Sequence, residues 1–130
     1  MIAFDFFVPG RPVPWARAAQ QGRRKYVAPP QRAHRAAVSS MAACCLPHRA
    51  RAHAGAVRID LEFVYPLRAG DAEGDPFVFV PDVDNLIKLV CDALSGIGFR
   101  DDRQIFEIRA RKIRGAEVGT AVRLEYLDDG

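Results

Sequence analysis

The chain has 130 residues, of which 49% are hydrophobic, and 19 Lys or Arg against 16 Asp or Glu give a net charge of +3. This length and composition predict one small globular domain over residues 1–130 and exclude a disordered or low-complexity chain. Because no run of 18 apolar residues and no leader-like N-terminus is present, we expect no membrane span and a cytoplasmic protein.

The three cysteines, Cys44, Cys45 and Cys91, are an odd number and two of them are adjacent. Such a set is a poor disulfide framework and indicates reduced thiols. Adjacent helical residues also point about 100° apart, which disfavours a shared zinc ion. We therefore expect buried, apolar thiols rather than a metal site.

Charge is distributed unevenly along the chain. Residues 6–59 contain ten Lys or Arg and no Asp or Glu, whereas the remainder contains all 16 acidic residues. A basic half beside an acidic half is suited to a polyanion that carries metal ions on its phosphates. The alternative is an ordinary solvated basic face.

The first segments predict a strand followed by an irregular loop. Residues 2–8 alternate in the manner of a strand. Residues 9–17 contain three prolines, which exclude regular structure, together with Arg11, Trp15 and Arg17. Trp15 can stack on a nucleobase, or it can be a core anchor or a dimer contact, and the sequence leaves both possibilities open.

A basic segment over residues 20–28 is either a hairpin tip or a flexible arm, and Pro29 and Pro30 then favour a helix start. We predict a helix over residues 31–46. Its expected apolar face comprises Ala33, Ala37, Val38, Met41, Cys44 and Cys45. The expected DNA contacts, chosen because basic side chains bind phosphates, are Arg11, Arg17, Arg23, Arg24, Lys25, Arg32, Arg35 and Lys112.

Residues 57–66 alternate clearly and predict a second strand, and residues 67–80 form an acidic loop whose carboxylates we expect to be solvated. Further strands are predicted from residue 104 to 113 and from 118 to 127. With the helix described next, the order βαβαββ predicts a small α+β domain in which a mixed or antiparallel four-stranded sheet packs against two helices.

The segment between the acidic loop and the third strand carries the candidate chemistry. Asp82 and Asp84 stand at the mouth of a predicted helix whose apolar residues share one face. Lys88 follows one turn after Asp84, and Asp101 and Asp102 follow the helix. Carboxylates that converge bind a hard divalent cation, and a nearby lysine can meet the charge of a phosphate undergoing transfer. The plain alternative is a capped amphipathic helix with an Asp–Lys pair.

This segment resembles the core motif of the RusA family of Holliday junction resolvases. The resemblance rests on Asp82-x-Asp84-Asn85-Leu86-x-Lys88, on Asp92-Ala93-Leu94 within the helix, and on Asp101-Asp102-x-Gln104-Ile105. It implies that Asp82, Asp84 and Asp102 bind catalytic Mg²⁺, or Mn²⁺, and that Lys88 is essential. Asp101 is a possible further metal-site residue. Trp15 departs from the small polar or basic residue expected in the family's early loop.

The resemblance also implies a homodimer that resolves four-way DNA junctions by paired symmetric nicks, since a two-fold dimer matches a two-fold junction. Two other functions remain open at this point. One is a non-catalytic module that binds branched DNA through its basic half. The other is a metal-dependent phosphohydrolase of small nucleotides, although no glycine-rich phosphate-binding motif is present.

Overall fold

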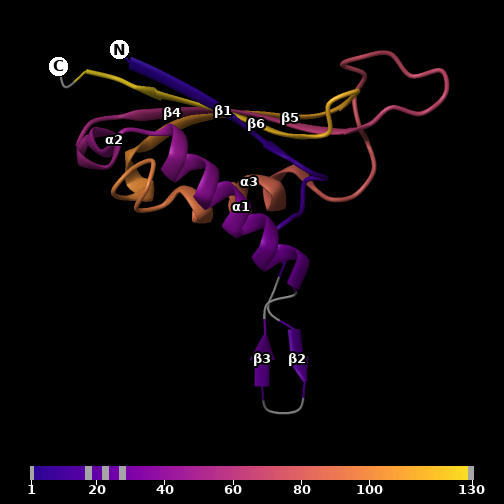
Figure 1. Cartoon of the computed structure of the whole chain (residues 1–130), viewed down its shortest axis with the longest axis horizontal. Helices are drawn as coiled ribbons and strands as arrows, with labels where there is room; N and C mark the ends of the chain where they lie inside the picture. Colours follow the sequence, from indigo (N-terminus) through magenta and orange to yellow (C-terminus); the bar gives the residue numbers. More distant parts are fainter. Residues whose placement is uncertain (1, 17–18, 22–23, 27–28, 129–130) are drawn as a thin grey trace.

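The computed structural model describes residues 2–16, 19–21, 24–26 and 29–128. It places helices on one face of a four-stranded sheet, with a two-stranded hairpin apart from that sheet (Figure 1). The elements in chain order are β1 (Ile2–Pro9), β2 (Ala19–Gln21), β3 (Arg24–Tyr26), α1 (Pro29–Cys45), α2 (His48–Ala52), β4 (Val57–Pro66), α3 (Val83–Leu94), the 3-10 turn η1 (Asp102–Gln104), β5 (Ile105–Gly115) and β6 (Gly119–Tyr126).

The predicted α+β class and its βαβαββ order are confirmed by β1, α1, β4, α3, β5 and β6. The structure adds the β2–β3 hairpin within the basic segment, the short helix α2 where a basic connection was expected, and η1. None of the helices in the described ranges is both long and apolar enough to cross a membrane.

The strand order β1-β6-β4-β5 makes the sheet mixed. β6 runs antiparallel to both β1 and β4, whereas β4 and β5 run parallel. Parallel neighbours cannot be joined by a tight turn, because the chain must return along the sheet before it enters the second strand. The return is made by residues 67–104, and α3 is its regular part.

Alternation along β4 separates the two faces of the sheet. Val57, Ile59 and Phe63 are fully buried, whereas Arg58 and Asp60 point to the other, partly exposed face. Burying one such large apolar side chain stabilises the fold by roughly 2 kcal/mol. The buried face therefore fixes which side of the sheet the helices cover.

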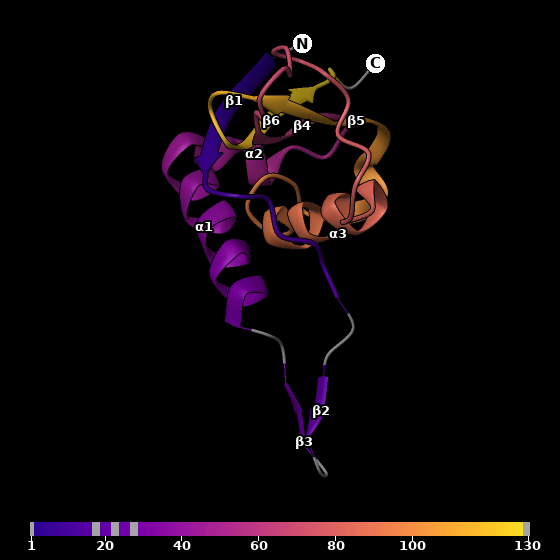
Figure 2. The same cartoon turned by 90° about the vertical axis from the view of Figure 1, so that its right-hand side faces the viewer.

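The two long helices lie side by side beneath the sheet (Figure 2). The Ser39 hydroxyl on α1 donates to the Ala93 carbonyl on α3 at 2.9 Å, which ties them together. In α3 the predicted apolar face is confirmed, with Leu86, Leu89, Val90, Ala93 and Leu94 all buried.

The predicted apolar face of α1 is wrong in most positions. The buried residues are Gln31, His34, Val38 and Ala42, whereas Ala33 and Ala37 are exposed. Alanine-rich helices lack a strong apolar stripe, so tertiary contacts decide their orientation. Gln31, for example, is buried because its side-chain oxygen accepts the Ala16 backbone N–H at 3.1 Å.

The expected burial of the cysteines is likewise wrong for two of them. Cys44 and Cys45 are exposed, and Cys91 is half-buried. His34 on α1 is buried, and burial lowers its pKa.

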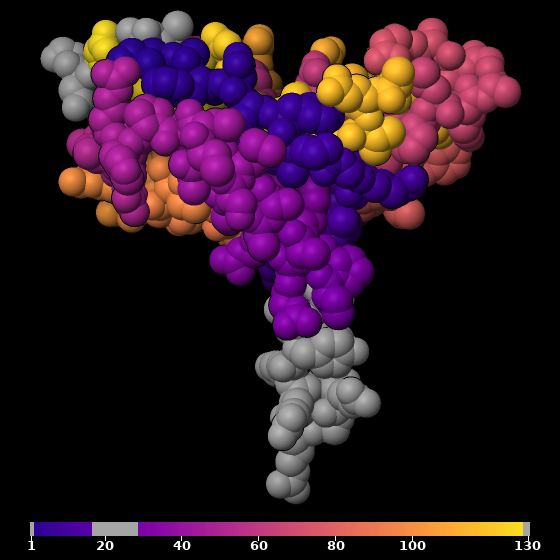
Figure 3. All heavy atoms as spheres, viewed as in Figure 1, coloured from indigo at the N-terminus to yellow at the C-terminus, as the bar shows by residue number. Residues whose placement is uncertain are grey.

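The acidic loop 67–80 is mostly exposed, as expected, and forms part of the molecular surface (Figure 3), but several of its residues are also bonded to the rest of the chain. The Asp71 carboxylate accepts the Arg68 backbone N–H at 2.7 Å and lies 3.3 Å from Nε of Arg114. The backbone N–H of Arg68 is the main cause that lowers the pKa of Asp71, and both guanidinium groups add to it. Phe77 stacks on Tyr65 with ring centroids 4.0 Å apart. The loop therefore has fixed attachment points at the C-terminal end of β5.

We expect Arg114→Met to lower the free energy of unfolding by about 3 kcal/mol, because it removes one partner of a buried ion pair. Arg114 is 5% exposed and also donates to the Pro66 carbonyl at 2.8 Å. Urea denaturation measures the change. The matched control is Arg109→Met on the same strand, where the exposed pair with Glu107 should contribute less than about 0.5 kcal/mol. Equal effects of the two substitutions would contradict the role given to Arg114.

Candidate active site

At the beginning of α3, two carboxylates make no hydrogen bond or ion pair with the described residues. Asp82 occupies the N-cap position, but its side chain makes no capping hydrogen bond. Asp84 lies in the first turn, and both side chains are exposed. A capping role would require a bond from the carboxylate to a free backbone N–H, so it does not account for Asp82. Both groups are available to an external ligand.

Lys88 lies on the outer face of α3, one turn after Asp84. Its ammonium nitrogen is 3.6 Å from the centroid of the Trp15 ring. The backbone N–H of Trp15 donates to the Asn85 carbonyl at 2.9 Å, so the proline-rich segment is attached directly to this helix. Nothing in the sequence pattern indicated this contact, because the two residues belong to segments far apart in the chain.

Asp101 and Asp102 have different roles in the structure. The Asp101 carboxylate accepts the Arg103 backbone N–H at 2.9 Å and forms a capping box with Gln104 at η1. That backbone N–H is the main cause that lowers the pKa of Asp101. Asp102 is exposed. Burial raises the pKa of the Cys91 thiol to about 11, and the charge of Asp102 adds to that rise. Asp102 begins η1, which follows α3 and leads directly into β5.

The structure does not bring Asp102 to Asp82 and Asp84 within one chain. At about 1.5 Å per residue, Asp84 and Cys91 are separated by roughly 10 Å along the helix axis. Among residues 2–16, 19–21, 24–26 and 29–128, no three His, Cys, Asp or Glu side chains form a group that can hold a metal ion. Mg²⁺ nevertheless needs only one or two protein carboxylates when phosphate oxygens and water complete its shell. The pair Asp82 and Asp84 fits that requirement.

The Lys112 ammonium is hydrogen-bonded to the backbone that leads into α3. It donates to the carbonyls of Phe79 and Pro81, at 2.7 Å each. These hydrogen bonds give Lys112 a structural role at the peptide that precedes Asp82, and the expectation that it contacts DNA stays a prediction. No local sequence pattern indicates these hydrogen bonds, since the acceptors are main-chain atoms.

The other expected DNA contacts fall into three groups. Arg32 and Arg35 are exposed on α1, and Arg11 is exposed with its guanidinium 5.1 Å from the Tyr65 ring centroid. Arg17 and Arg23 lie outside the described residues. Arg24 and Lys25 lie in β3, of which only the backbone is described.

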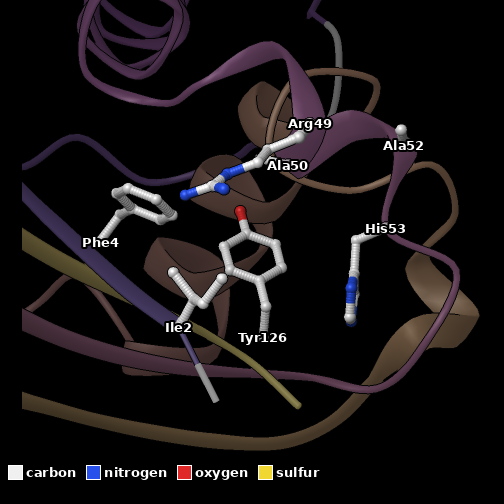
Figure 4. A pocket seen from close by; sticks show the side chains of 7 residues that line it. All are labelled: Ile2, Phe4, Arg49, Ala50, Ala52, His53 and Tyr126. Carbon is white, nitrogen blue, oxygen red and sulfur yellow. The ribbon is translucent and has the colours of Figure 1, made fainter. Parts of the chain in front are cut away.

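A pocket of about 260 Å³ lies elsewhere, between the beginning of β1, α2 and the end of β6 (Figure 4). Its lining residues are Ile2, Phe4, Arg49, Ala50, Ala52, His53 and Tyr126. Among the residues that the structure describes, its lining includes no carboxylate and none of the residues expected to be catalytic. The motif residues Asp82, Asp84 and Lys88 lie instead on the exposed surface at the start of α3.

Comparison with protein families identifies a match over most of the chain. The family model described as "Endodeoxyribonuclease RusA" matches residues 9–125, which is nearly the whole chain. The search of curated proteins found no match to the chain.

We expect Lys112→Met to accelerate backbone amide hydrogen exchange over residues 77–86, because two carbonyls at the entry to α3 lose their donor. Mass spectrometry of the exchanging protein measures this. Arg111→Met is the neighbouring control, since that side chain is largely exposed and pairs with Glu62. If exchange over this segment is unchanged in Lys112→Met, the lysine does not hold the entry to α3.

Proposed function

The chain belongs to the RusA family of endodeoxyribonucleases, and from this premise we propose that it cuts four-way DNA junctions by paired symmetric nicks that depend on Mg²⁺. Membership assigns it to nucleases that bind DNA and resolve Holliday junctions in recombination. The main support for the proposed metal-dependent cleavage is the pair of exposed carboxylates at the start of α3, one turn before Lys88. Neither carboxylate is bonded to another side chain or backbone group in the described residues.

Asp82 and Asp84 are the proposed holders of the metal, together with phosphate oxygens of the DNA. A divalent ion bound there supplies a more acidic water and polarises the phosphate. Mn²⁺ offers similar oxygen coordination and is a candidate substitute. The chain's own contribution is to present the two carboxylates on a rigid helix end that Lys112 and the packed face of α3 hold in place.

Lys88 is the proposed residue that meets the negative charge developing on the phosphate. An ammonium is effective in this role when it is already positioned and makes no ion pair that the reaction must break. Within the described ranges, no carboxylate lies within ion-pairing distance of Lys88. Arg11, Arg32 and Arg35 are proposed to bind backbone phosphates, which position the junction without reading its sequence.

Asp102 is proposed to complete the metal site through a homodimer. Among the described residues of one chain, it does not form a metal-binding group with Asp82 and Asp84. In a two-fold dimer, each surface of one copy has an equivalent on the other, so Asp102 of a second copy can approach the helix start of the first. One such site on each side of the two-fold axis suits paired nicking of a two-fold junction. Asp101, which caps η1, is assigned a supporting role only.

Asp82→Asn and Asp84→Asn should each lower the rate of junction nicking at least about 100-fold, because each removes a metal-binding charge while keeping the shape of the side chain. The measurement is cleavage of a labelled four-way junction, with linear duplex for comparison, in Mg²⁺, Mn²⁺ and EDTA. Binding measured in Ca²⁺ should be retained.

The matched control is Asp60→Asn on the opposite face of the sheet, which should cleave normally. Binding without cleavage by the wild-type protein in any metal would instead favour a non-catalytic DNA-binding module. Activity on small nucleotides alone would favour a phosphohydrolase.

A mixture of two inactive variants should regain activity if Asp102 acts across the dimer. One variant carries Asp82→Asn with Asp84→Asn, and the other carries Asp102→Asn. After co-refolding, about half of the dimers are mixed, and each mixed dimer has one complete site, so about a quarter of the wild-type sites return. The recovered activity should make single rather than paired nicks. Absence of recovery in dimers shown to be mixed would mean that Asp102 does not act across the interface.

A further inference from the structure

The proline-rich segment 9–16 is fixed at three points beside the candidate site. The Trp15 N–H donates to Asn85 on α3, and the Ala16 N–H donates to the buried Gln31 side chain on α1. The Tyr65 hydroxyl donates to the Pro12 carbonyl at 3.3 Å. This segment is therefore a fixed strap across α1, α3 and β4, and Trp15 is held with its ring half-buried against the core.

The strap places the indole under the ammonium of Lys88. The distance from Nζ to the ring centroid, 3.6 Å, is well inside the range of about 6 Å in which a cation is attracted to an aromatic face. Asp84 lies one helical turn before Lys88, where an ordinary Asp–Lys pair forms readily. In the described part of the chain this pair is absent, and the indole is the partner of the ammonium.

We propose that Trp15 is a positioning residue that holds the Lys88 ammonium on its ring face and so keeps it out of an ion pair with Asp84. This inference rests on the nuclease function proposed above. It has two chemical consequences. The Asp84 carboxylate keeps its full charge for a divalent cation, and the Lys88 ammonium keeps its charge for a phosphate, because a ring face attracts a cation without neutralising it.

The same geometry bears on the other interpretations of Trp15. A tryptophan that stacks on a nucleobase must present a free ring face to the DNA. Here the ammonium occupies one face, and the ring packs against the apolar core cluster. The structure therefore favours a role inside the site over stacking on a base.

A spectroscopic test of the contact requires no DNA or metal. The chain has only three lysines, Lys25, Lys88 and Lys112, so ¹³C labelling of lysine gives few side-chain signals. Lys88→Arg identifies the Lys88 signal by its loss. We expect ring-current shifts of the Lys88 ε-methylene protons that Trp15→Phe partly retains and Trp15→Leu abolishes. An unmoved Lys88 signal in Trp15→Leu overturns the proposal, whatever the nuclease assays show.

The kinetic test separates positioning from DNA binding. Trp15→Leu should lower kcat for junction nicking by about tenfold or more, because the ammonium is no longer placed for the phosphate. KM and the junction Kd should be unchanged, and Trp15→Phe should restore most of the rate. In a Lys88→Met background, Trp15→Leu should have no further effect, since Trp15 acts through that lysine.

The control is Phe106→Leu, an exposed aromatic residue with Arg58 5.2 Å from its ring centroid, which should leave kcat unchanged. Thermal melting checks that each variant is folded, and Trp15→Phe carries the test if Trp15→Leu is not. A loss that appears in Kd rather than kcat overturns the positioning role in favour of direct DNA contact. If the wild-type protein nicks no branched DNA with any divalent metal, the nuclease proposal fails and the positioning role fails with it, whereas the lysine signals still report the contact itself.

Discussion

The parallel pairing of β4 with β5 is the constraint on which the arrangement of the motif depends. Parallel neighbours require the chain to return along the sheet, and α3 makes that return. The helix therefore begins near the end of β5, where Lys112 holds Pro81, and ends near the start of β5, which Asp102 precedes. Residues that are close in the sequence motif are separated by the length of the helix, and a second copy of the chain is the proposed means of reuniting them.

The C-terminal end of β5 is where the sheet fixes the candidate site. Arg114 is buried against Asp71 and the Pro66 carbonyl, and Lys112, two residues earlier, donates to the carbonyls of Phe79 and Pro81. Both side chains are cations that bond to the acidic loop 67–80 or to its ends, so that the loop is attached to the sheet although most of its residues are exposed. The start of α3 is then fixed by the packing of its apolar face and by the bonded loop that leads into it. Support of this kind fixes the helix start from which Asp82 and Asp84 project.

Charge is divided between structural and chemical uses with little overlap. Asp71 and Asp101 each accept a backbone N–H that lowers the carboxyl pKa, and both stabilise turns. Within the described part of the chain, Asp82 and Asp84 make no such bond, and Lys88 contacts an aromatic face instead of a carboxylate. These are the groups that we propose respond to metal and phosphate. The division is the reason why only part of an apparently uniform acidic motif enters the proposed chemistry.

Local patterns in the sequence determined the strands, the α+β class and the buried face of α3, because alternation and helical periodicity are properties of neighbouring residues. They also indicated that Asp82 and Asp84 stand at the mouth of a helix. The orientation of α1 escaped prediction, since an alanine-rich helix carries too weak an apolar stripe to specify one face. Only the tertiary structure decided three other features. These are the partners of Lys112, the contact between Trp15 and Lys88, and the separation of Asp102 from the other aspartates. Each of these depends on which distant segments the parallel crossover and the proline-rich strap bring together, and no local pattern encodes that.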